Sequence, residues 1–150
     1  MVSSGVEAIL NFLPISDAIG TAGQPTAEQF AAIRTADYDI VVNLALPNST
    51  NALPNEWELV TELCMTYVLI PVQWEHPTQV DLQQFFGIMD GFLGKRIFVH
   101  CVMNMRVSAF MLLYRVLRLR VPLETARQDM LRIWEPNETW QQFIDDALAQ

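Results

Sequence analysis

The chain has 150 residues, of which 51% are hydrophobic, so it can bury one core, and its length predicts a single domain over residues 1–150. Its formal net charge of −8 argues against nucleic-acid binding, because a phosphate backbone requires a basic surface. Its apolar runs end within about ten residues, whereas a transmembrane helix needs roughly 20, and no basic residue precedes them as in a signal peptide. We therefore expect a cytoplasmic protein that binds no membrane.

Short apolar runs alternate with longer amphipathic stretches, a pattern typical of α/β domains. Residues 15–23 predict a short hairpin at the edge of a sheet. Residues 39–44, 67–70 and 97–100 are rich in β-branched and aromatic side chains and predict buried strands.

Helices are predicted from capping pairs and from helical periodicity. Three capping pairs mark helix starts: Thr26 with Gln29, Asn55 with Glu58, and Thr78 with Asp81. Apolar residues recur at helical spacing after Arg106, and two further helices are predicted over residues 122–134 and 137–149. The predicted fold is therefore an α/β domain with a small central, mostly parallel sheet of four or five strands. Helices flank this sheet and make up the C-terminal third.

The basic residues are concentrated in the last part of the chain. Residues 1–94 hold one basic residue, Arg34, against eleven acidic ones, whereas residues 95–150 hold eight basic and six acidic residues. A locally positive site on an acidic protein suits a small anion better than a polyanion.

The two cysteines, Cys64 and Cys101, are expected to be free thiols in a reducing compartment. Cys64 lies in a helix predicted over residues 58–64 and is interpreted as a small buried hydrophobe. The two histidines, His76 and His100, do not combine with the cysteines in a zinc-binding spacing. We expect no metal and no cofactor.

The segment from His100 to Arg106 carries the predicted chemistry. Cys101 follows a strand and Arg106 opens a helix, so the four residues between them must curl and turn their backbone N–H groups inward as an anion cradle. The Arg106 guanidinium can hold two anion oxygens, and the positive field favours the Cys101 thiolate. The predicted loop for phosphate or sulfate comprises His100, Val102, Met103, Asn104, Met105, Arg106, Val107 and Ser108.

Two of these residues also have simpler interpretations. Cys101 could be a small buried hydrophobe, as most free cysteines are. His100 precedes the cradle, so its position favours ordering the loop through a backbone hydrogen bond over transferring protons.

This segment resembles the His-Cys-…-Arg signature of the protein tyrosine and dual-specificity phosphatases. Residues 15–17, 22–25, 41–44 and 70–72 extend the resemblance to a bacterial dual-specificity-like branch. The resemblance implies metal-free hydrolysis of a phosphorylated protein or a small phosphate ester through a cysteinyl-phosphate intermediate. It implies that Cys101 is the nucleophile, Arg106 the phosphate binder and His100 a loop-ordering residue.

The sequence departs from this family pattern in two places. Four residues separate Cys101 from Arg106 where the phosphatase signature has five, and Asn104 stands where the family has a glycine, a position that asparagine tolerates better than most residues. The family also places Ser or Thr directly after the arginine, where this chain has Val107, with Ser108 one residue later. Because four is the loop length of rhodanese sulfurtransferases, two alternatives stay open: a sulfurtransferase acting through Cys101, and an anion-binding module without turnover.

A cysteine phosphatase also needs an acid that protonates the leaving oxygen. The position nearest the family's aspartate is Trp74, which could instead form an aromatic wall of the pocket. Glu75 is the predicted proton donor, and its simpler interpretation is a solvated loop carboxylate. His76 is a weaker candidate, and Asp81 is better explained as the capping partner of Thr78.

Overall fold

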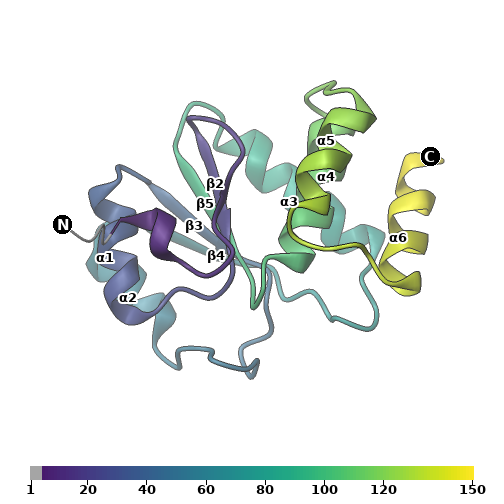
Figure 1. The fold of residues 1–150 in the computed structure, drawn as a ribbon. Helices are drawn as coiled ribbons and strands as arrows, with labels where there is room; N and C mark the ends of the chain where they lie inside the picture. The colour runs from purple at the N-terminus through teal and green to yellow at the C-terminus, as the bar shows by residue number, and fades with distance from the viewer. Residues whose placement is uncertain (1–4) are drawn as a thin grey trace.

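The computed structural model describes residues 5–150, and its centre is one five-stranded sheet (Figure 1). The strand order is β1-β2-β5-β3-β4; β1 pairs antiparallel with β2, and all other pairs are parallel. The strands are β1 (Leu13–Pro14), β2 (Ile19–Ala22), β3 (Ile40–Asn43), β4 (Thr66–Leu69) and β5 (Ile97–His100). The expected mostly parallel sheet is confirmed. The expected edge hairpin is present as the β1–β2 pair, but its first strand ends just before the predicted range of residues 15–23.

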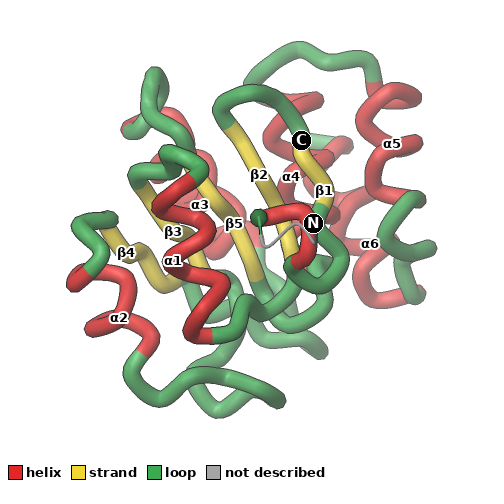
Figure 2. Tube along the Cα trace, turned by 60° about the vertical axis from the view of Figure 1, so that its left-hand side comes forward, coloured by secondary structure: helices red, strands yellow, loops and turns green. Residues whose placement is uncertain are grey.

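Helices cover both faces of this sheet (Figure 2). One face carries α1 and α2, and the other packs against α3, α4, α5 and α6. The helices are α1 (Ala27–Thr35), α2 (Glu56–Glu62), α3 (Gln79–Gly91), α4 (Met105–Leu117), α5 (Leu123–Leu131) and α6 (Glu138–Leu148), with a 3₁₀ turn, η1, at Val6–Ala8. Within residues 5–150, no helix has the length and apolar character that crossing a membrane requires.

Two of the three predicted capping pairs are present. Thr26 and Thr78 each form a capping box with the third residue of the helix that follows. The pair at Asn55 was predicted wrongly: its side chain makes no capping hydrogen bond, and its backbone (φ −118°, ψ 29°) lies outside the extended conformation of a typical N-cap. The interpretation of Cys64 was also wrong. This cysteine lies beyond the end of α2 at φ 63° and is exposed.

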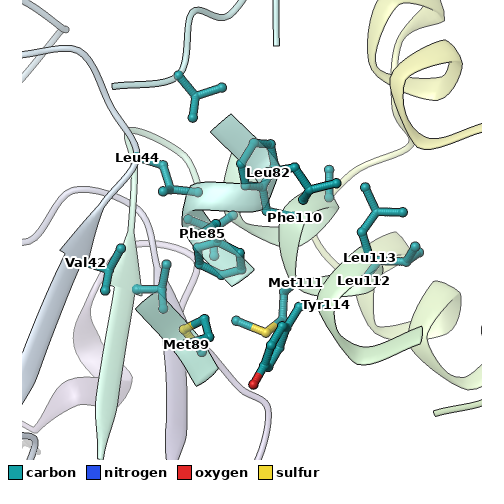
Figure 3. Close-up of a cluster of buried hydrophobic side chains, with 14 of the residues drawn as sticks. Val42, Leu44, Leu82, Phe85, Met89, Phe110, Met111, Leu112, Leu113 and Tyr114 are labelled. Carbon is teal, nitrogen blue, oxygen red and sulfur yellow. The ribbon is translucent and has the colours of Figure 1, made fainter. Parts of the chain in front are cut away.

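The larger core lies between the sheet and α3, α4 and α6 (Figure 3). Phe85 of α3 packs edge to face against Phe110 of α4, with the ring centroids 5.7 Å apart. Tyr114 of α4 also packs edge to face against Phe85, with the ring centroids 6.1 Å apart. All residues of α4 from Arg106 to Tyr114 are buried. Fully burying each large apolar side chain contributes about 1.5–3 kcal/mol, so this helix is held firmly on the sheet. Its N-terminus therefore gives a rigid base to the loop that precedes it.

Strand β5 lies between β2 and β3 and runs parallel to both. Cys101 follows β5 directly, so it lies at the edge where three parallel strands end. Ligands of open α/β sheets bind outside these carboxyl ends.

Candidate active site

The loop after β5 is short because one residue takes a left-handed backbone conformation. Asn104 has φ 68° and ψ 4° and directly precedes α4, as its place in the sequence predicted. Its side-chain amide donates to the backbone oxygen of Asn11 at 2.8 Å and to Oγ1 of Thr21 at 3.1 Å. The turn is thereby tied to the N-terminal segment.

The backbone carbonyls of the loop also face the N-terminal segment. The N–H of Gln24 donates to the oxygen of Val102 at 3.0 Å, and Nδ2 of Asn11 donates to the oxygen of Met103 at 3.0 Å. Gly23 permits this approach, because a Cβ at that position would lie 2.6 Å from the Val102 oxygen. Because C=O and N–H point in opposite directions in a trans peptide, the N–H groups of Met103 and Asn104 point toward the opposite side of the loop.

Six consecutive N–H groups of the loop remain available for a ligand. Within residues 5–150, the amides of residues 102–107 donate no hydrogen bond to the protein, whereas the Ser108 amide donates to the oxygen of Asn104 at 2.9 Å. Backbone N–H groups without a partner at a helix N-terminus form an anion-binding concavity.

Arg106 is a buried cation that lacks an anionic partner within the described residues. The residue is 7% exposed, forms none of the ion pairs of residues 5–150, and its buried Nε has no hydrogen-bond partner there. Its guanidinium carbon lies 5.6 Å from the centre of the Trp74 ring. Burying an unpaired charge is costly, so this arrangement is suited to an anionic ligand that supplies the missing partner.

Cys101 and Arg106 line the same pocket, whose volume is about 390 Å³. Cys101 is a free thiol and only 1% exposed. The lining residues are Leu46, Asn48, Ser49, Thr50, Trp74, Cys101, Val102, Met103, Met105 and Arg106. Among the described lining residues, Arg106 alone carries a fixed charge, and Trp74 contributes an aromatic wall. The pocket therefore offers one cation and a thiol between apolar and neutral polar surfaces.

Not every residue of the predicted phosphate loop reaches this pocket. Cys101, Val102, Met103, Met105 and Arg106 line it, whereas His100, Asn104, Val107 and Ser108 do not. The Ser108 hydroxyl donates to the oxygen of Met105 at 2.8 Å and accepts from Nε1 of Trp134 at 2.9 Å, so it supports the loop from behind.

The predicted proton donor lies elsewhere. Glu75 and its alternative His76 line a separate depression together with residues of α6. Asp81 caps α3 through Thr78, as expected.

The sequence analysis missed two parts of this region. Leu46, Asn48, Ser49 and Thr50, in the loop after β3, form one side of the pocket. Their position after a strand parallel to β5 was a usable signal, because such loops meet at one edge of the sheet. The other missed residue is Glu56, the buried first residue of α2.

Glu56 is held beneath the loop by His100. Nε2 of His100 lies 2.8 Å from Oε2 of Glu56, and Nδ1 lies 3.2 Å from the backbone oxygen of Cys101, the contact expected of a loop-ordering histidine. Burial alone would raise the pKa of Glu56, but the hydrogen bond and charge of His100, with hydrogen bonds from Gln24 and Tyr67, hold that pKa below its ordinary value. The carboxyl group is therefore ionised at neutral pH.

Comparison with known proteins shows which solved structures share this fold. No family model matches the chain, and no curated protein matches it. A solved DUF442 protein from Shewanella putrefaciens CN-32, described as a candidate phosphatase, is 33% identical over 96% of this chain and 95% of its own, with a TM-score of 0.89.

More distant structures share the fold alone. Pseudomonas aeruginosa TpbA, solved with phosphotyrosine, is 13% identical over 99% of this chain and 85% of its own, with a TM-score of 0.68. The catalytic core of the Saccharomyces cerevisiae PP-IP phosphatase SIW14, solved with citrate, is 15% identical over 92% of this chain and 87% of its own, with a TM-score of 0.75. The identity to the Shewanella protein over nearly the whole of both chains shows that this chain belongs to the DUF442 family of candidate phosphatases.

Proposed function

We propose that the chain is a cysteine-dependent phosphoric monoester hydrolase in which Cys101 is the nucleophile and Arg106 binds the phosphoryl group. One observation carries this proposal: within residues 5–150 a buried guanidinium that forms no ion pair shares a pocket with a thiol, and six amides of the adjoining loop donate no hydrogen bond. These groups match the needs of a tetrahedral oxyanion attacked by sulfur.

The proposed reaction has two displacement steps. The Cys101 thiolate attacks phosphorus, the bond to the ester oxygen breaks, and the leaving oxygen departs with its electron pair and takes up a proton. Water then attacks the cysteinyl phosphate, which releases inorganic phosphate and restores the thiolate. Arg106 and the loop amides stabilise the negative charge on the phosphoryl oxygens in both steps.

The leaving oxygen takes up a proton in this reaction. Among the described residues that line the pocket, none carries a carboxyl group, and the predicted donor Glu75 lines a separate depression. The pocket therefore favours esters whose oxygen leaves without protonation, such as aryl phosphates. A volume of about 390 Å³ is suited to a small phosphate ester or to the side chain of a phosphorylated protein.

Sulfur transfer is the second candidate function. The four-residue loop and the absence of a carboxyl group among the lining residues favour it, because sulfite leaves thiosulfate as an anion and needs no acid. In that reaction the Cys101 thiolate attacks the sulfane sulfur, the S–S bond of thiosulfate breaks, and Cys101 becomes a persulfide.

Both cysteines are free thiols, which fits the reducing cytoplasm that we propose for the protein.

One parallel assay separates the candidates. Purified protein is tested with an aryl phosphate and with thiosulfate plus cyanide, using Cys101→Ser and, as the matched control, replacement of the other thiol by Cys64→Ser. Phosphate release that survives Cys64→Ser and is lost in Cys101→Ser supports the phosphatase. Thiocyanate formation with the same dependence would instead support the sulfurtransferase. Phosphate binding without either product would leave an anion-binding module and overturn both enzymatic proposals.

A further inference from the structure

Glu56 joins the ends of three parallel strands beneath the Cys101 loop. The carboxyl group is 5% exposed and accepts hydrogen bonds from Gln24, which follows β2, and from Asn43, which ends β3, at 2.8 and 3.2 Å. Its third partner is Nε2 of His100, which ends β5, at 2.8 Å. A glutamate so deeply buried is rare unless it is paired.

The donors around Glu56 are fixed by their other contacts. Oδ1 of Asn43 accepts from the N–H of Ala45 at 2.9 Å, so Nδ2 must face Glu56. Nε2 of Gln24 also donates to the backbone oxygen of Pro25 at 3.0 Å, which fixes that amide. Both carboxyl oxygens of Glu56 therefore accept hydrogen bonds from neutral amides before His100 is considered.

The contacts of His100 define where its protons lie. Nδ1 faces the carbonyl oxygen of Cys101, which can only accept, so Nδ1 carries a proton. Nε2 faces the carboxylate of Glu56, which also accepts. An imidazole with acceptors at both nitrogens is satisfied when it carries two protons and a positive charge. The ring is fully buried, and Phe30 packs on it edge to face at 5.9 Å.

Charges on the surrounding elements leave this pair intact. Within residues 5–150, the other titratable side chain in this network is Tyr67 of β4, whose hydroxyl accepts from Nδ2 of Asn43 at 3.0 Å. Burial and the negative charge of Glu56 raise the pKa of Tyr67, so the phenol stays neutral. The pair is neutral overall, but its positive member contacts the Cys101 carbonyl and its negative member lies on the far side of the imidazole ring.

We propose that Glu56 and His100 form a buried ion pair that positions the phosphate loop and supports the Cys101 thiolate through the charge of His100. Glu56 acts through His100 and so is a positioning residue. The role of the ion pair in catalysis rests on the proposed function, but the ion pair itself can be tested without measuring turnover.

The test is the pH profile of Cys101 alkylation by iodoacetamide, measured in a Cys64→Ser background. Glu56→Gln keeps the shape of the side chain and removes the negative charge that faces Nε2 of His100, so the proposed ion pair is lost. We expect the midpoint of alkylation to move to higher pH and the rate at neutral pH to fall about tenfold, as a thiolate that loses a neighbouring cation does. Glu58→Gln, on the exposed side of the same helix, is the matched control and should leave the profile unchanged.

A second variant guards against misfolding. If Glu56→Gln fails to fold, the double variant Glu56→Gln with His100→Asn leaves no unpaired charge, and we expect it to show the same shift. An unshifted profile in whichever of these variants folds would overturn the ion pair. Because alkylation does not require hydrolysis, that result with normal phosphatase activity would refute the inference alone. A shifted profile in a protein without phosphatase activity would refute only the proposed function.

Discussion

The guanidinium carbon of Arg106 lies 5.6 Å from the centre of the Trp74 ring. Trp74 is in turn packed against Trp134 and Trp140, with ring centroids 5.3 and 5.7 Å away, and Nε1 of Trp140 donates to the Trp74 backbone oxygen at 2.8 Å. Trp134, in the connection between α5 and α6, and Trp140 of α6 thus support the indole that contacts the guanidinium. The C-terminal part of the chain therefore bears on the anion site through Trp74.

Replacing Arg106 by Lys should weaken anion binding while the fold survives. Lysine keeps the charge but loses the planar fork and the contact with the indole. Charge-assisted hydrogen bonds contribute about 1.5–3 kcal/mol, so the inhibition constant for inorganic phosphate should rise about tenfold or more. Arg132→Lys, at a largely exposed arginine, is the control. Equal phosphate inhibition in wild type and Arg106→Lys would exclude Arg106 from the anion site.

Gly23→Ala should displace the loop, although Gly23 itself does not line the pocket. The new Cβ would lie 2.6 Å from the Val102 oxygen, which is backbone and can move only with the loop. We expect phosphatase activity to fall at least tenfold as the N–H groups lose their alignment. Gly87→Ala in α3 is the matched control, since a Cβ there meets nothing within 4 Å. That change should raise the free energy of unfolding by about 0.5–1 kcal/mol and leave activity intact. Normal activity in Gly23→Ala would mean that this contact does not position the loop.

The sequence could predict features that depend on a residue and its immediate neighbours. Residues 97–100 form β5 as predicted, because a run of β-branched and aromatic residues suits a strand buried on both faces. Asn104 takes the left-handed conformation that its place at the family's glycine implied, because such a turn restricts residue choice locally. These features depend on the residue and its immediate neighbours.

The features that could not be predicted depend on distant partners. Glu56 begins a helix, where an acidic residue is ordinary, and only the approach of Gln24, Asn43 and His100 makes it a buried carboxylate. The Asn55–Glu58 pattern matched a capping box, but Asn55 adopts another backbone conformation and α2 begins with the side chain of Glu56 turned inward. Local patterns cannot show which side chain the tertiary structure will bury.

Protein stability should depend on the ionisation of Glu56. Its pKa is lowered in the folded state, so its contribution is fully present above the ordinary carboxyl pKa and is lost as the pH falls through the lowered folded value. Wild type should exceed Glu56→Gln in free energy of unfolding by about 1.5–3 kcal/mol at neutral pH, the range of a charge-assisted hydrogen bond. Urea unfolding at a series of pH values measures this gap, which should close under acid. A gap that stays constant with pH would contradict an ionised Glu56.

The role of Glu75 can be measured through the leaving group. If Glu75 is the proton donor, Glu75→Gln should slow hydrolysis of a phosphoserine ester by about 10²–10⁴-fold and barely change hydrolysis of an activated aryl phosphate. The alkaline limb of the pH profile should also disappear. Glu135→Gln, at another glutamate outside the pocket, serves as control. Small and equal effects on both substrates would remove Glu75 from the mechanism, in line with its place in a separate depression.

The central claim is that Cys101 forms a covalent bond to phosphorus, and trapping that intermediate tests it most directly. The protein is mixed with an aryl phosphate, quenched in acid during turnover, digested, and analysed by mass spectrometry. We predict that the peptide containing Cys101 gains the mass of one phosphoryl group, that Cys64→Ser protein gives the same adduct, and that Cys101→Ser protein neither turns over the ester nor forms a cysteinyl phosphate. Continued phosphate release by Cys101→Ser protein, or turnover by wild type with the phosphoryl group on another residue, would contradict the account.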